Sequence, residues 1–205
     1  MKSPLLLLPL LLILSFTFTS KPFFVSSQTD AVVDTDGDSL RTGGTYYILP
    51  VFRGRGGGVE SGAARRGLCP LAVVQAPSEL SRGVPVKFSR VDGKNGTVPM
   101  SKNLNIMFLG PNICRQSNVW NVGPYDEEVN QYFVITGGVL GIPGPETAGN
   151  WFKIEKVNRA YKIVFCPSVR RISKAPCKDV GIYMDGVVWR LALSDMPLGV
   201  KFKKV

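Results

Sequence analysis

The sequence predicts an all-β protein, built as a barrel or a sandwich with long connecting loops. Apolar runs of five to seven residues, rich in Val, Ile, Phe and Tyr, recur between clusters of Gly, Pro, Asn and Asp. No window keeps the i, i+3, i+4, i+7 spacing of an amphipathic helix for long. No stretch has the character of an interdomain linker, because the glycine-rich segment 54–67 lies directly beside Cys69. These observations favour one domain of short strands.

The predicted strands are spread along the whole chain after its first 44 residues. They cover residues 45–49, 71–75, 84–88, 104–108, 132–136, 151–157, 161–166, 180–184, 188–193 and 198–202. Three strand cores begin at Tyr46, Leu104 and Tyr161, which lie 58 and 57 residues apart. This spacing suggests a three-fold repeat. Tyr46 and Tyr47 are expected to point one inward and one outward, and Trp120, Trp151 and Trp189 to be core or interface aromatics.

The N-terminus has the order of a secretory signal peptide. Lys2 is followed by an apolar run at 5–14 and then by small polar residues. The run is shorter than the roughly 20 residues that a membrane span needs. We therefore expect a signal peptide over residues 1–27, a single domain over 28–205, and a secreted protein of the apoplast or the vacuole.

The predicted mature chain is basic. Removal of residues 1–27 takes away Lys2 and Lys21 but no acid, so the formal charge falls from +10 to +8. A secreted protein seldom meets nucleic acid, so acidic wall polymers, anionic lipids or an acidic protein are better partners for this surface, and solubility alone is a sufficient explanation.

Four cysteines, Cys69, Cys114, Cys166 and Cys177, imply two disulfides in a secreted chain. From sequence alone three pairings are open. The cysteine spacings do not match a zinc site.

The sequence contains no histidine, which excludes Ser-His-Asp and Cys-His hydrolases and removes the commonest metal ligand. The acidic run that starts at Asp34 begins like a calcium loop, but Ser39 and Thr45 occupy the positions that need Gly and Glu. The segment 53–58 lacks the Gly-Lys-Ser/Thr ending of a phosphate-binding loop. We expect neither an enzyme nor a metal or cofactor.

Five segments carry a family resemblance, in the right order over nearly the whole mature chain: VVDTDGDSLRTGGTYYILP (32–50), CPLAVVQAPSELSRGVPVKF (69–88), NLNIMF (103–108), WFKIEKVNRAYKIVFCP (151–167) and CKDVGIYMDGVVWRLALSDMPLGVKFKK (177–204). They closely resemble plant Kunitz inhibitors of the soybean-trypsin-inhibitor type, and especially the miraculin-like branch. The resemblance implies a β-trefoil of twelve strands with three-fold pseudosymmetry. It also implies the pairs Cys69–Cys114 and Cys166–Cys177.

Inhibitors of this family present an exposed loop that enters a serine protease as a substrate would. By resemblance, the reactive position falls on Lys94 followed by Asn95, or on Gly93 if the alignment starts from Gly83, with Arg90 as a lesser candidate. A basic residue there implies a trypsin-like target. The alternative is that these are ordinary charges on a solvated loop.

Three departures from the family pattern concern this loop. Thr42 replaces an asparagine that supports the loop from behind, and its shorter side chain is expected to fall short. Gly93 and Gly96 flank the proposed scissile bond and should make the loop more flexible. Asn95-Gly96-Thr97 is an N-glycosylation sequon, and a glycan on Asn95 would block a protease cleft.

A second basic segment lies between Cys166 and Cys177. It carries Arg170, Arg171 and Lys174, and a short disulfide would constrain it. Either Arg171 or Lys174 could therefore be the working residue, while the alternative is a solvated basic hairpin.

Two functions from different classes follow. The first is a monomeric, secreted inhibitor of a serine protease, with another protease class as a further target. The second is a non-inhibitory, miraculin-like storage, defence or carbohydrate-binding protein. A lectin site would need an aromatic platform beside clustered Asp, Asn or Gln, and the sequence alone does not place one.

Overall fold

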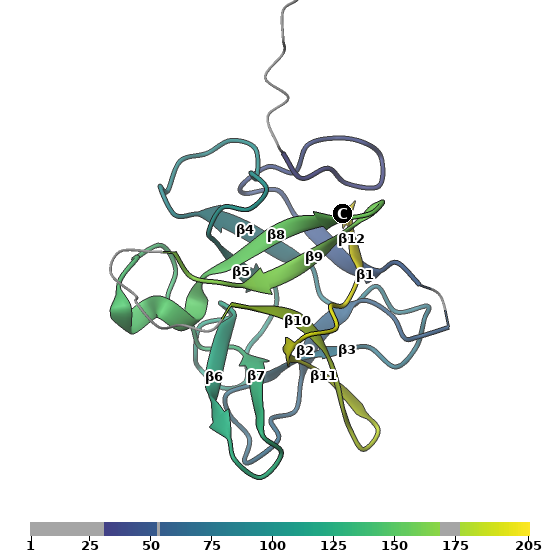
Figure 1. The fold of residues 1–205 in the computed structure, drawn as a ribbon, viewed down its shortest axis with the longest axis vertical. Coiled ribbons are helices and arrows are strands. Elements are labelled where there is room, and N and C mark those ends of the chain that lie inside the picture. The colour runs from purple at the N-terminus through teal and green to yellow at the C-terminus, as the bar shows by residue number, and fades with distance from the viewer. Residues whose placement is uncertain (1–30, 53, 169–176) are drawn as a thin grey trace, which may run out of the picture.

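The computed structural model describes residues 31–52, 54–168 and 177–205, and this part of the chain contains twelve β-strands and one 3-10 helix (Figure 1). The strands are β1 Tyr46–Pro50, β2 Val59–Gly62, β3 Ala72–Gln75, β4 Val86–Arg90, β5 Leu104–Phe108, β6 Asn121–Asp126, β7 Gln131–Ile135, β8 Phe152–Val157, β9 Ala160–Phe165, β10 Lys178–Asp185, β11 Val188–Ser194 and β12 Val200–Lys204; the helix η1 spans Pro145–Asn150.

Six strands form a closed antiparallel ring. Three long ladders join β1 to β12, β4 to β5 and β8 to β9. Three contacts of one residue pair each join β1 to β4, β5 to β8 and β9 to β12. Each ring strand therefore has a partner on both sides, which removes the exposed edges that an open sheet would have.

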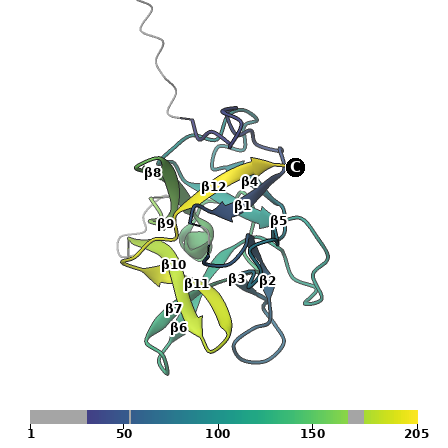
Figure 2. The same cartoon turned by 90° about the vertical axis from the view of Figure 1, so that its right-hand side faces the viewer.

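The other six strands form three hairpins that cover one end of the ring (Figures 1 and 2). The hairpins are β2–β3, β6–β7 and β10–β11. They also pair with one another, at Ala72 with Ile135, at Arg190 with Val74 and at Ala192 with Phe133. The chain thus repeats the order ring strand, hairpin, ring strand three times.

The predicted repeat corresponds to this connectivity. Tyr46, Leu104 and Tyr161 lie in β1, β5 and β9, the first ring strand of each unit. Each of the ten predicted strands matches an observed one within a few residues.

The sequence analysis missed β2, β6 and η1. Strand β2 reads VESG and holds a single large apolar residue. Strand β6 reads NVGPYD, and its register with β7 shifts between Val122 and Tyr125. The composition of these two segments does not by itself favour a strand, and pairing with β3 and β7 across each hairpin stabilises them.

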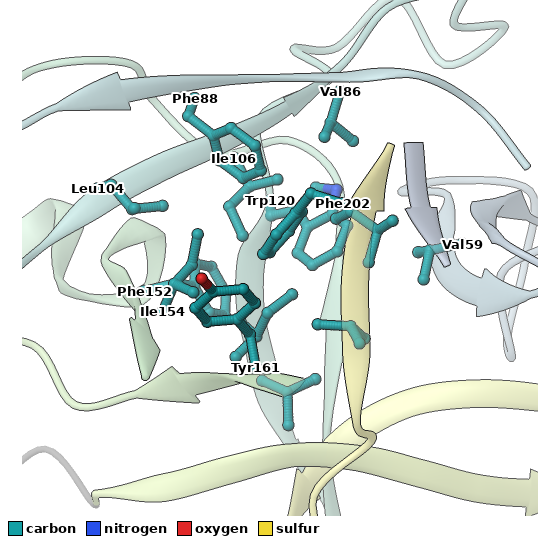
Figure 3. Packing of buried hydrophobic residues seen from close by; sticks show 14 of the residues in the cluster. Val59, Val86, Phe88, Leu104, Ile106, Trp120, Phe152, Ile154, Tyr161 and Phe202 are labelled. Carbon is teal, nitrogen blue, oxygen red and sulfur yellow. The ribbon is translucent and has the colours of Figure 1, made fainter. Parts of the chain in front are cut away.

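The core fills the ring (Figure 3). Phe202 is fully buried and packs on Phe88 with ring centroids 5.5 Å apart and on Tyr161 at 5.7 Å. Trp120 packs edge-on against Phe152 at 6.0 Å. Trp120 and Trp151 are fully buried, as predicted for core aromatics, while Trp189 is half-buried. Tyr46 points inward, whereas Tyr47 is half-exposed.

Both disulfides have the predicted pairing. Cys69–Cys114 joins the loop between β2 and β3 to the loop between β5 and β6, across a sequence separation of 45 residues. Cys166–Cys177 joins the end of β9 to the start of β10, across 11 residues.

We predict that Phe202→Ala lowers the free energy of unfolding by about 3–5 kcal/mol, the usual cost of deleting a buried phenyl group. The cavity would open where β12 closes the ring. Neighbouring strands could fill it only by giving up their pairing with β12, so little relaxation is expected. Urea unfolding with both disulfides intact would measure the change. A loss below about 1 kcal/mol would contradict the role given to this ring.

Candidate functional site

The loop 91–103 joins β4 to β5 and projects from the ring on the side away from the hairpin cap (Figure 1). The structure brings Gly93, Lys94 and Asn95 together as exposed residues of this loop. Residues 96–100 are half-buried or buried, with Val98 fully buried, and the chain is exposed again at Ser101 and Lys102. The loop is therefore exposed at its first half and anchored at its second.

Asp92 organises the exposed half of the loop. Its carboxylate accepts hydrogen bonds from the Lys94 backbone N–H at 3.1 Å and from two nitrogens of the Arg90 guanidinium, at 3.1 Å and 2.7 Å. The Lys94 N–H, and then the Arg90 side chain, lower the pKa of the Asp92 carboxyl below its ordinary value. The Gly93 N–H donates to the Arg90 carbonyl at 3.1 Å. The backbone of Lys94, the residue before the proposed scissile bond, is thus held by Asp92, and Asp92 is itself held by Arg90.

Sequence reasoning missed this arrangement, and it changes the assignment of Arg90. The Arg90 guanidinium, considered there as a lesser protease contact, is paired within its own loop. The signal was present: an Asp-Gly pair commonly forms a turn in which the Asp side chain accepts a backbone N–H two residues on. The Arg two residues before Asp92 supplies the matching charge.

Thr42 supports the anchored half of the loop, and the expectation that its side chain is too short is wrong. Its hydroxyl oxygen accepts the Gly96 N–H at 3.0 Å and lies 3.3 Å from the Gly96 carbonyl oxygen. The Thr42 N–H also donates to that carbonyl, at 2.9 Å. The threonine reaches because its backbone runs directly beside Gly96, which allows the shorter side chain to replace a longer one.

A buried backbone ladder continues this support. The Val32 N–H donates to the Val98 carbonyl at 3.0 Å, and the Val98 N–H donates to the Leu40 carbonyl at 2.8 Å. The Leu40 N–H then donates to the Val32 carbonyl at 2.8 Å. All three side chains are fully buried. The N-terminal segment and the loop therefore form one packed layer on the end of the ring.

Two core tyrosines tie this layer to the ring. The hydroxyl of Tyr46 accepts the Arg41 N–H at 2.9 Å, and the hydroxyl of Tyr161 accepts the Val33 N–H at 3.0 Å. A Cβ on Gly44 would lie 2.7 Å from the Tyr46 hydroxyl oxygen, so glycine is required there. Gly44 thus has a packing role, whereas Gly43 adopts a positive φ of 81° with open space around it.

The acidic run at 34–38 forms a turn. One carboxylate oxygen of Asp34 accepts the N–H groups of Asp36 and Asp38, both at 3.0 Å, and Asp34 is buried. This carboxylate is therefore occupied by the backbone. No group of three or more potential metal ligands occurs in the part of the chain that the structure describes.

The second candidate segment, with Arg170, Arg171 and Lys174, lies outside the described residues. The described residues beside it show one link to the first loop: the Asn103 side-chain amide donates to the Ser168 hydroxyl at 3.0 Å.

The structure therefore combines a closed ring of six strands with an exposed loop that is held by hydrogen bonds. This arrangement suits a protein that binds a partner through the loop. A family model described as "Trypsin and protease inhibitor", of the legume Kunitz type, matches residues 32–204. The chain therefore belongs to the plant Kunitz family of protease inhibitors, which confirms the resemblance found in the sequence. It is a member of a family of inhibitors and is not an enzyme.

Relatives extend over almost the whole chain. Kunitz trypsin inhibitor 5 of Arabidopsis thaliana is 42% identical over 198 residues, which cover 97% of each chain. Miraculin of Synsepalum dulcificum is 45% identical over 186 residues, covering 87% of this chain and 84% of miraculin. The solved structure of the Kunitz-type cysteine protease inhibitor PCPI-3 from potato has a TM-score of 0.74 and 33% identity, covering 86% of this chain and 98% of that one.

The relatives thus include inhibitors and miraculin at similar identity, so family membership alone does not decide the activity. Helices long and apolar enough to cross a membrane do not occur within 31–52, 54–168 or 177–205.

We predict that Thr42→Val speeds hydrogen exchange of the Gly96 amide about 3- to 10-fold, because the isosteric valine removes one hydrogen bond worth roughly 1 kcal/mol. Exchange measured by NMR on the folded protein would test this. Thr35→Val, at an exposed threonine of the same segment, is the control and should leave Gly96 unchanged. Equal exchange rates in Thr42→Val and the wild type would refute the supporting role.

We predict that the hydrogen bonds from Lys94 and Arg90 to the Asp92 carboxylate, which we call the Asp92 clamp, persist across neutral and mildly acidic pH. The folded loop stabilises the carboxylate form, so the support is complete above the ordinary aspartate pKa of about 3.9 and is lost as pH falls through the lowered pKa. The Lys94 amide proton shift, followed by NMR from pH 7 downward, should move with a midpoint below that ordinary value. Asp92→Asn should abolish the transition. A midpoint at or above the ordinary value would contradict the clamp.

Proposed function

We propose that this protein is a secreted, monomeric inhibitor of a trypsin-like serine protease and that Lys94 is the residue that enters the specificity pocket. The observation that carries the proposal is the position of Lys94: it is exposed, and its backbone N–H is fixed by Asp92 while Thr42 holds Gly96 two residues later. A loop held in this way has little conformational entropy left to lose on binding.

The chemistry of the contact follows from the charges. Trypsin-like proteases place a carboxylate at the base of the specificity pocket. A lysine side chain that reaches it from a rigid loop forms a desolvated, charge-assisted pair. The basic charge of the chain, +10 before any processing, would favour encounter with an acidic protease surface. Asn95 would then follow the scissile bond.

The wider proposal concerns the fold and the processing. We infer that the six-stranded ring and its three hairpins form a β-trefoil, supported by the three-fold order of ring strand, hairpin and ring strand. We also infer a signal peptide at 1–27 and a mature domain at 28–205.

The sequon gives this loop two exclusive states. Asn95 is exposed and adjoins Lys94, so a glycan attached to Asn95 would fill the space that a protease cleft must occupy. We propose that the unglycosylated chain inhibits and that the glycosylated chain does not. The non-inhibitory, miraculin-like function is the second candidate, favoured by the sequon and by the 45% identity to miraculin.

We predict that titration of trypsin with the mature, unglycosylated protein gives one-to-one inhibition and that Lys94→Ala weakens it at least about 100-fold, as expected for loss of a central buried contact. Lys102→Ala, at an exposed lysine of the same loop, is the matched control and should inhibit like the wild type. The titration is then repeated with mature protein from a glycosylating host, with the sequon intact and with Thr97→Ala, so that only the first form can carry a glycan.

The outcomes separate the candidates. Inhibition that appears only in Thr97→Ala would support the glycan switch. Undiminished inhibition by Lys94→Ala would refute this loop and direct the search to Arg171 and Lys174. Absence of inhibition in both forms of the sequon would favour the miraculin-like function.

A further inference from the structure

The hairpin cap carries a groove that the protease-binding loop does not use. Its volume is about 400 Å³, and it lies between the β6–β7 hairpin and the strands β10 and β11. Tyr125, Tyr132, Asn130, Gln131, Ser194 and Asp195 line it, and we call it the tyrosine groove. The β6–β7 hairpin points away from the ring, whereas the loop 91–103 projects from the ring's other side (Figures 1 and 2).

Two tyrosines whose rings are in tilted contact, at an interplanar angle of 49°, form one wall of the tyrosine groove. Tyr125 in β6 and Tyr132 in β7 are directly opposite each other, with ring centroids 4.9 Å apart. Tyr132 packs against the hydrophobic core, while its neighbour Tyr125 is 44% exposed. The core therefore fixes the side chain of Tyr132, and the partly exposed aromatic face of Tyr125 offers an apolar surface to a ligand.

Amide side chains next to the tyrosines are oriented by the hairpin itself. The Tyr125 hydroxyl donates to Asn130 Oδ1 at 3.0 Å, and the Tyr132 N–H donates to Gln131 Oε1 at 3.0 Å. Because the amide oxygens accept these bonds, the NH₂ groups of the same side chains are the donors left to face the groove.

The facing wall supplies both donors and acceptors. Ser194 Oγ accepts the Met196 N–H at 3.0 Å, which leaves the hydroxyl hydrogen to donate. The carboxylate of Asp195 pairs with Lys178, and its side chain is 84% exposed, so it can accept further hydrogen bonds. The pairing of one acid with one base leaves this wall without net charge.

A sugar ring matches this combination. It has an apolar C–H face that can cover a tyrosine ring, and hydroxyls that each donate and accept. The balanced charge of Lys178 and Asp195 favours a neutral sugar over an acidic one. A neighbouring groove of about 320 Å³ shares Lys178, Ser194 and Asp195 with the first and is also lined by Cys166 and Cys177. A ligand longer than one sugar unit would extend in that direction.

We propose that the tyrosine groove binds a neutral oligosaccharide, with Tyr125 as the stacking platform and Asn130, Ser194 and Asp195 as hydrogen-bonding partners. This activity goes beyond protease inhibition and uses none of the residues assigned to it. One molecule could therefore hold a carbohydrate at the cap and a protease at the loop.

The test is binding of neutral hexasaccharides of glucose, mannose, xylose or N-acetylglucosamine to the mature protein, followed by NMR and by isothermal titration calorimetry. At least one should bind saturably. Tyr125→Ala should weaken that binding about tenfold, which corresponds to the loss of one aromatic contact of about 1.4 kcal/mol. Tyr125→Phe keeps the ring and should lose less. Asn130→Asp keeps a residue that tolerates the positive φ of 52° and removes the amide donor, so it should also weaken binding.

Controls keep the result interpretable. Tyr47→Ala removes a half-exposed tyrosine from the ring and should bind sugar like the wild type, while thermal unfolding confirms that each variant is folded. Absence of saturable binding to every neutral hexasaccharide would overturn the proposal. So would binding that survives Tyr125→Ala, or binding restricted to an acidic hexasaccharide of galacturonate and abolished by salt.

Discussion

The last strand, β12, closes the ring, and this closure holds together the core and the N-terminal segment that supports the 91–103 loop. It pairs with β1 over five residues and with β9 through Val200 and Tyr161. The Phe202 carbonyl also accepts the Thr35 N–H at 2.8 Å, and the Val205 N–H donates to the Thr45 carbonyl at 3.1 Å. The two described ends of the chain are thus fastened together. A ring open at this seam would expose two strand edges and the face of Phe202.

The 91–103 loop is supported by the ring through a series of hydrogen bonds. Tyr46 and Tyr161 hold the N-terminal segment, whose backbone in turn holds Val98 and Gly96. Asp92 fixes the other side. The two glycines beside Lys94 and Asn95 do not leave the loop unsupported, because the N–H of each is hydrogen-bonded. These hydrogen bonds restrict the loop before any partner is met, which would lower the entropic cost of the binding that we propose.

The same connectivity separates the two surfaces for which we propose a function. The ring presents the loop at one end, and the hairpins present the tyrosine groove at the other (Figure 2). No residue named for one surface contributes to the other, so each can change without disturbing its counterpart. A fold of this kind does not prescribe one activity, and relatives named as trypsin inhibitors and as miraculin are consistent with that freedom.

The all-β class, the ten richest strands and the exposed position of Lys94 could be predicted from the amino-acid sequence, and the two disulfide pairs from family resemblance. Those features depend on local composition and on residue order, which the sequence contains directly. It did not determine β2 or β6, whose residues adopt strands only because partners across the hairpin pair with them. Nor could it show that Thr42 reaches Gly96, because 54 residues separate them. These contacts required the tertiary structure, which also placed Tyr125 in one groove with Ser194 and Asp195. Packing of the β6–β7 hairpin beside the β10–β11 hairpin brings these residues together although they lie far apart in the sequence, and local composition does not encode such a contact.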